Sequence, residues 1–63
     1  MFLVEIKEET FRESGMQFLA KIGFEPNRPY RVLSVVSDKL LLVKDDGEMV
    51  ELYPRKCKYV MDE

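Results

Sequence analysis

The chain has 63 residues, 46% of them hydrophobic, and its 10 basic and 12 acidic side chains give a net charge of −2. This length holds one domain, residues 1–63, and excludes most enzymes that need a large cleft between layers of secondary structure. Intrinsically disordered chains combine low hydrophobicity with high net charge, and this chain has neither property.

The chain contains no histidine and a single cysteine, Cys57. Without histidine it lacks the usual general base, the usual activator of a serine or cysteine nucleophile and a common metal ligand. A single cysteine cannot form an intramolecular disulfide, which small secreted domains usually need, so we expect a cytoplasmic protein. The sequence shows neither a signal peptide nor a transmembrane segment. We expect no enzyme activity, no cofactor and no metal ion.

The first predicted strand covers residues 2–7, where Phe2, Val4 and Ile6 alternate with three other residues. A period of two with aromatic and β-branched residues is typical of a strand with one buried face. We therefore expect a strand here, which ties down the N-terminal end of the domain.

The next segment allows two interpretations. Ser14-Gly15-Met16-Gln17 fits a capping box, and Gly23 stands where a helix commonly ends, which predicts a short helix around residues 14–22. Such a helix is short enough to be marginal on its own. The alternative is a strand at residues 17–22 that follows a loop at residues 11–16. The sequence leaves both interpretations open.

Two prolines within residues 25–29 interrupt any helix or central strand. The following residues, 30–37, form the most β-prone stretch of the chain because they are rich in β-branched and aromatic side chains. This strand is predicted to end at a turn over Ser37-Asp38-Lys39.

A β-hairpin is predicted around Asp45-Asp46-Gly47. A two-residue turn would place the like charges of Asp45 and Glu48 opposite each other. A three-residue loop, with Gly47 in the left-handed conformation, places Lys44 opposite Glu48 instead. Opposite charges facing each other across strands favour a register by roughly 0.2–1 kcal/mol, so we predict the three-residue loop. On the core face, it pairs Leu42 with Val50 and Leu40 with Leu52.

The chain ends with a predicted one-turn break at residues 54–57 and a last strand at residues 58–61. Five short strands with tight turns indicate a mainly β fold, a small five-stranded barrel. Residues 24–60 resemble a family of small SH3-like barrel proteins of Gram-positive bacteria, their prophages and their phages. The resemblance is carried by Pro29-Tyr30-Arg31-Val32-Leu33, Leu40-Leu41-Leu42-Val43-Lys44-Asp45-Asp46-Gly47-Glu48, Leu52-Tyr53-Pro54-Arg55 and Tyr59-Val60.

The resemblance implies an SH3-like fold and little about activity, because most such proteins have no assigned function. The segment from Thr10 to Gly23 has no clear counterpart in the family. Function on a rigid scaffold tends to concentrate in added segments and loops, so we expect a protein-binding site there. The residues of this predicted site are Arg12, Glu13, Met16 and Gln17.

The chain also carries more large apolar residues than a small core needs. Leu41, Val43 and Met49 fall on the hairpin face opposite the core, where either residues 10–23 cover them or they form an exposed interaction patch. We therefore expect a non-catalytic protein–protein interaction module. A phage-encoded module would bind and modulate a protein of the bacterial host, and self-association into a homodimer is a further expectation.

The alternative function is nucleic-acid binding through a cluster of basic and aromatic side chains, a combination typical of single-strand binding surfaces. Its residues are Tyr53, Arg55, Lys56, Lys58 and Tyr59. The negative net charge opposes this alternative. Asp45, Asp46 and Glu48 do not match the spacing of a calcium loop and are explained by the hairpin turn, and Cys57 is predicted to be buried.

Overall fold

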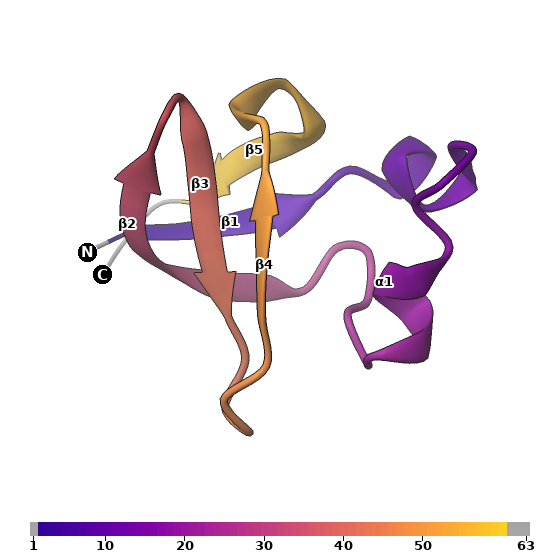
Figure 1. Ribbon diagram of the computed structural model, residues 1–63, viewed down its shortest axis with the longest axis horizontal. Helices are drawn as coiled ribbons and strands as arrows, with labels where there is room; N and C mark the ends of the chain where they lie inside the picture. Colours follow the sequence, from indigo (N-terminus) through magenta and orange to yellow (C-terminus); the bar gives the residue numbers. More distant parts are fainter. Residues whose placement is uncertain (1, 61–63) are drawn as a thin grey trace.

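A computed structural model describes residues 2–60. Five antiparallel strands form one sheet in the order β4-β3-β2-β1-β5 (Figure 1). The prediction of a mainly β fold is confirmed. The strands are β1 (Phe2–Ile6), β2 (Pro29–Val36), β3 (Lys39–Val43), β4 (Met49–Leu52) and β5 (Cys57–Val60). The short helical elements are the 3₁₀ turns η1 (Glu8–Arg12) and η2 (Pro54–Lys56) and the single α-helical turn α1 (Phe18–Lys21).

The sheet is strongly bent, so that β3 and β4 lie in front of β1 and β5 in Figure 1. β2 runs from one of these layers into the other. The pairing of β2 with β3 shifts between Val32 and Ser34, which leaves Leu33 as an extra residue on β2. An extra residue on one strand bends that strand and increases its twist. The bulge at Leu33 therefore helps β2 to belong to both layers.

The core lies between the two layers of the bent sheet and is completed by the segment that joins β1 to β2. Alternate residues of β1, Val4 and Ile6, are buried as the period of two predicts, and Phe2 is half-buried. Leu19 of α1 and Phe24 are also buried in this core. Burying such a side chain contributes about 1.5–3 kcal/mol to the stability of the folded state. The connecting segment is therefore part of the hydrophobic core and helps to stabilise it.

The hairpin between β3 and β4 has the predicted register, with Leu42 opposite Val50 and Leu40 opposite Leu52. The three-residue loop is closed by the Lys44 N–H, which donates to the Glu48 carbonyl oxygen at 2.8 Å. Gly47 has a φ of +95°, in the left-handed region predicted for it. Both the loop length and the position of the glycine are confirmed.

The turn between β2 and β3 lies at Ser37 and Asp38, with φ angles of +51° and +68°. Val36 and Lys39 pair directly across it. Two consecutive left-handed residues are typical of the tight hairpin turn that matches the twist of the flanking strands. The predicted turn is confirmed.

The helix predicted around residues 14–22 is shorter than expected. α1 has four residues, its N-cap position is Gln17, and no side chain caps it, so the predicted capping box does not form. Gly15 at φ +84° turns the chain away from a helical path at the predicted start. The alternative interpretation, a strand at residues 17–22, is wrong.

The end of α1 is as predicted, because Gly23 takes a left-handed φ of +97°. The Phe24 N–H donates to the Leu19 carbonyl oxygen at 2.9 Å, and the Gly23 N–H donates to that of Ala20 at 3.1 Å. This pair of bonds is a Schellman motif, which satisfies carbonyl groups at the end of a helix. Among residues 2–60, no helix has the length and apolar character needed to cross a membrane.

Candidate functional site

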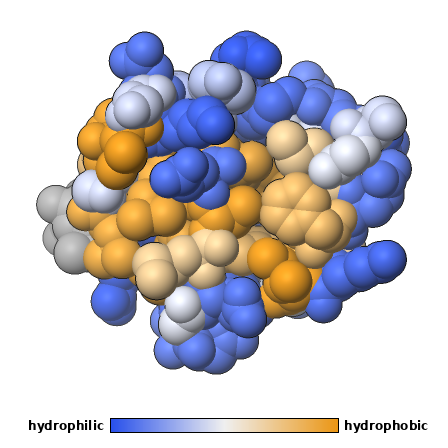
Figure 2. Space-filling model, in the orientation of Figure 1, coloured by the Kyte–Doolittle hydropathy of each residue, from blue (hydrophilic) through white to orange (hydrophobic). Residues whose placement is uncertain are grey.

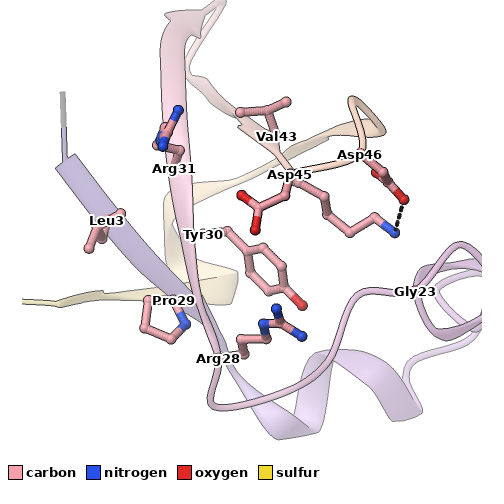
Figure 3. Close-up of a pocket in the computed structure, with 10 residues that line it drawn as sticks. Leu3, Gly23, Arg28, Pro29, Tyr30, Arg31, Val43, Asp45 and Asp46 are labelled. Carbon is pink, nitrogen blue, oxygen red and sulfur yellow. Dashed lines mark hydrogen bonds and ion pairs between the residues drawn. The ribbon is translucent and has the colours of Figure 1, made fainter.

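A groove of about 400 Å³ lies between the chain entering β2 and the loop of the β3–β4 hairpin (Figure 3). Its residues include Leu3 of β1, Arg31 of β2 and Val43 of β3. Leu3 pairs with Arg31 and Arg31 pairs with Val43, so the three form one row across neighbouring strands. This row faces away from the core, so one side of the groove adjoins the outer face of the sheet.

One side of the groove is held by Lys44. Its Nζ atom donates to the carbonyl oxygen of Ile22 and to Asp46 Oδ2, the latter at 3.1 Å. The same ammonium lies 5.5 Å from the centre of the Phe24 ring. Lys44 therefore joins the hairpin loop to the end of α1 on this side of the groove.

Asp46 stabilises the hairpin loop from within. The Glu48 N–H donates to Asp46 Oδ1 at 3.0 Å, and Lys44 binds the other carboxylate oxygen. The pKa of Asp46 is lowered by these hydrogen bonds, first by the backbone N–H of Glu48 and then by the side chain of Lys44. The role of Asp46 in the hairpin loop thus agrees with the turn explanation. The described residues contain no group of three or more His, Cys, Asp or Glu side chains that could hold a metal ion.

On the opposite side of the groove, Tyr30 is held by two contacts. Its hydroxyl accepts a hydrogen bond of 2.7 Å from the Glu25 N–H, and its ring lies 4.8 Å from that of Phe24. Two arginines flank this tyrosine. Arg28 is 3.9 Å from Glu25, and Arg31 makes no ion pair with any residue in the range 2–60.

Charges of both signs meet in the groove, because Asp45 and Asp46 line it together with the two arginines. In Figure 3, Arg31 of β2 and Asp45 of the hairpin loop lie above the Tyr30 ring. Arg28, Arg31 and Asp45 are exposed, so they are available to a binding partner. Such a groove suits a partner that offers both acidic and basic groups around an apolar centre.

The outer face of the sheet continues from the groove across β3 and β4. Val43 pairs with Met49, and Leu41 of the next row pairs with Glu51. Leu33 at the bulge is 48% exposed and Met49 is 51% exposed, while Leu41 and Val43 are half-buried. We call these four apolar residues, Leu33, Leu41, Val43 and Met49, the outer patch.

Figure 2 shows an apolar band across the face on which β3 and β4 lie in front, with hydrophilic residues on both sides of the band. The sequence left open whether residues 10–23 cover the outer residues of the hairpin. Leu19 and Phe24 are instead buried in the core, and Phe11, Met16 and Ile22 also pack against it. The connecting segment therefore covers the core, and Met49 remains exposed.

The four residues of the predicted protein-binding site are not brought to the groove or the outer patch. Arg12 is exposed and 3.5 Å from Glu8, and Gln17 is exposed beside α1. Glu13 binds the ammonium of Lys56. Met16 is half-buried and packs against the core. Glu13 and Met16 thus have structural contacts, whereas protein binding by the exposed Arg12 and Gln17 stays a prediction.

The residues of the predicted nucleic-acid cluster separate into two groups. In the first, the guanidinium of Arg55 lies 4.7 Å from the centre of the Tyr53 ring, and the Nζ atom of Lys39 lies 5.1 Å from it. Lys39 was not predicted, because it comes from β3 and no local sequence pattern joins it to Tyr53. This aromatic ring between two cations is the part of the cluster that the structure brings together.

In the second group, the cations already have partners. Lys58 lies 3.8 Å from Glu5, and Lys56, which is 13% exposed, binds Glu13. The Tyr59 ring packs against that of Phe2 with a centre-to-centre distance of 5.4 Å. The positive charges of Lys56 and Lys58 are therefore balanced by Glu13 and Glu5.

Cys57 is buried, as predicted. Burial raises the pKa of its thiol to about 11, and the nearby charge of Lys7 opposes this shift only weakly. A thiol reacts as the thiolate, so burial disfavours the reactive form of Cys57 at neutral pH.

The residues that sequence reasoning missed are those of the groove, above all Arg28 and Arg31. The signal for Arg31 was its alternation with the buried Tyr30 and Val32, which places it on the outer face. Comparisons of the chain with protein-family models, with curated proteins and with solved structures give no match in any of the three. The candidate site therefore rests on its geometry and chemistry.

Proposed function

We propose that the chain is a small SH3-like barrel that binds another protein and has no catalytic activity of its own. The antiparallel order β4-β3-β2-β1-β5 and the 3₁₀ turn η2 just before the last strand support this architecture. The binding surface is the outer patch together with the adjoining groove. The two share Val43, so a partner can contact both at once.

The observation that carries this proposal is the exposure of apolar side chains on the outer face. Leu33 and Met49 each leave about half of their surface in water, and Figure 2 shows the apolar band to which this face contributes. Burying apolar surface gains roughly 25 cal/mol per Å². Exposed contiguous apolar surface next to polar groups is typical of a protein-binding site.

The charges of the groove favour a protein over a nucleic acid. A polyanion would be attracted by Arg28 and Arg31 but repelled by Asp45 and Asp46 of the same groove. A protein surface can offer both signs of charge and so satisfy all four groups. If the chain is phage- or prophage-encoded, the partner is a protein of the bacterial host.

The test is capture of partners from a bacterial lysate by the wild-type chain and by Met49→Lys. Met49 is half-exposed, so a lysine there leaves the core intact but places a charge in the outer patch. Val35→Lys is the matched control, because Val35 is also an exposed apolar residue but pairs with Leu40 on the core face. We expect Met49→Lys to lose the captured protein and Val35→Lys to retain it. Equal capture by both variants would count against the outer patch.

A second candidate function, single-stranded nucleic-acid binding, is favoured by one observation, the Tyr53 ring between Lys39 and Arg55. Such binding weakens steeply with salt because counterions are released from the phosphates. Fluorescence anisotropy with labelled RNA and single-stranded DNA at low ionic strength tests it, with Tyr53→Ala and Arg55→Ala as variants. No binding by the wild-type chain would remove this candidate.

A further inference from the structure

We propose that the outer patch docks against the outer patch of a second copy of this chain, about a two-fold axis. This inference rests on the proposed function for the use of the patch, and it names the partner. Its basis is a pair of opposite charges placed on either side of the apolar residues of β3.

The two charges are Arg31 on β2 and Glu51 on β4. Arg31 pairs with Val43 and Glu51 pairs with Leu41, and these two apolar residues lie two positions apart on the same face of β3. Arg31 and Glu51 are thus on a diagonal with Leu41 and Val43 between them. Both are exposed, and within residues 2–60 neither makes an ion pair.

This arrangement is self-complementary. In a two-fold interface, a contact from residue i to residue j is repeated from j to i. When two copies face each other with Leu41 and Val43 near the axis, Arg31 of each copy meets Glu51 of the other. A partner surface of a single charge sign would satisfy one of the two groups and repel the second, which is unfavourable at an interface.

The size of the molecule limits how small such an interface can be. Its two longer dimensions, 30 and 24 Å, outline a rectangle of about 720 Å², and a standard interface buries roughly 800 Å² on each partner. A stable dimer must therefore use most of one face of the molecule. Met49 and Leu33 extend the apolar contact on either side of β3, and an unbranched methionine adapts readily to an opposing surface.

The first measurement is the mass of the full chain by light scattering over concentrations up to about 1 mM, where even weak self-association is populated. The expected result is a rise from 7.5 kDa toward twice that mass. A mass that stays at 7.5 kDa over the whole range overturns the inference.

The second measurement uses charge reversal at the two residues. Arg31→Glu places acidic groups opposite Glu51 of the second copy, and Glu51→Arg places basic groups opposite Arg31. Each variant alone is expected to raise the dissociation constant of the dimer about tenfold or more, because like charges then meet twice in the interface. Lys21→Glu, an exposed residue at the end of α1, is the matched control and is expected to dimerise as the wild-type chain does.

The decisive sample is an equimolar mixture of Arg31→Glu and Glu51→Arg. In the mixed dimer, the two introduced side chains face each other across the axis as one ion pair. The native Glu51 of the first variant and the native Arg31 of the second form the other ion pair. The mixture should therefore dimerise more tightly than either variant alone. Circular dichroism and urea unfolding of each variant establish that the fold is kept. Dimerisation of both single variants at wild-type strength, or a mixture that stays monomeric, overturns the two-fold pairing.

These outcomes separate the inference from the proposed function. A wild-type chain that stays monomeric overturns docking of a second copy, whereas the proposed function is decided by whether capture of a different protein depends on Met49. A dimer that follows the charge-reversal pattern identifies the second copy as the partner.

Discussion

Thr10 Oγ1 donates a hydrogen bond of 3.2 Å to the carbonyl oxygen of Lys56, which lies 46 residues further along the chain. The same carbonyl accepts a hydrogen bond of 2.9 Å from the Lys7 N–H. The ammonium of Lys56 in turn binds Glu13. These contacts join η1 to η2, and so they hold the segment that covers the core against the start of β5.

Thr10→Val removes this hydroxyl while it keeps the shape of a buried side chain. We expect a loss of about 1 kcal/mol in the free energy of unfolding, the usual net value of one hydrogen bond. The loss stays small because the Lys56 carbonyl keeps its bond to Lys7. Urea unfolding measures it, with the exposed Ser14→Ala as control. An unchanged stability of Thr10→Val would mean that the hydroxyl does not help to hold the segment.

Gly47 tests backbone strain alone, because a Cβ atom added there would meet no other atom within 4 Å. At a φ of +95°, Gly47→Val should lower the free energy of unfolding by roughly 1–3 kcal/mol, the range for a strained residue. Gly47→Asn should cost less, since asparagine tolerates the left-handed region better than other residues. Equal losses for the two variants in urea unfolding would contradict strain as the cause.

Gly23 combines the same kind of strain with a close contact, since an added Cβ atom would lie 2.5 Å from Lys44 Nζ. Gly23→Ala should therefore cost more stability than Gly47→Ala, because it also displaces the ammonium that binds the Ile22 carbonyl. Replacing Lys44 by methionine removes this ammonium. In that background, the extra cost of Gly23→Ala should shrink. A double-mutant cycle from urea unfolding measures the coupling, and simple additivity would contradict it.

The stability of the fold should depend on Cys57 at alkaline pH. Burial raises the pKa of the folded thiol from its ordinary value of 9.0 to about 11. Below pH 9 the thiol is neutral in both states, so its contribution to stability is fully present. As the pH rises from 9.0 to about 11, the unfolded chain loses the proton first, which favours unfolding.

The measurement is the free energy of unfolding across this pH range for the wild-type chain and for Cys57→Ala. The alanine variant keeps the other titrating groups, so it serves as the control for them. The wild-type chain should lose more stability with rising pH than the variant does. Parallel curves would show that the Cys57 thiol is not desolvated in the folded state.

Local patterns in the sequence determined much of the sheet. The period of two at Phe2, Val4 and Ile6 predicted the strand β1, and the charges of Lys44 and Glu48 selected the hairpin loop. Gly23 predicted the end of α1. Each of these features depends on interactions between residues close in sequence, so one stretch of chain contains the information.

Features that depend on distant partners were decided only by the tertiary structure. α1 is stable although it is one turn long because Leu19 and the nearby Phe24 are buried in the core. The capping box does not form, and the chain turns at Gly15. Lys39 reaches Tyr53 from another strand, and Glu13 is held by Lys56. The groove and the outer patch exist because strand pairing places Leu3, Arg31 and Val43 side by side, although 28 and 12 positions separate them in the sequence. Which side chains become neighbours on a face is set by the order and register of the strands, and both are determined by burial of the whole core.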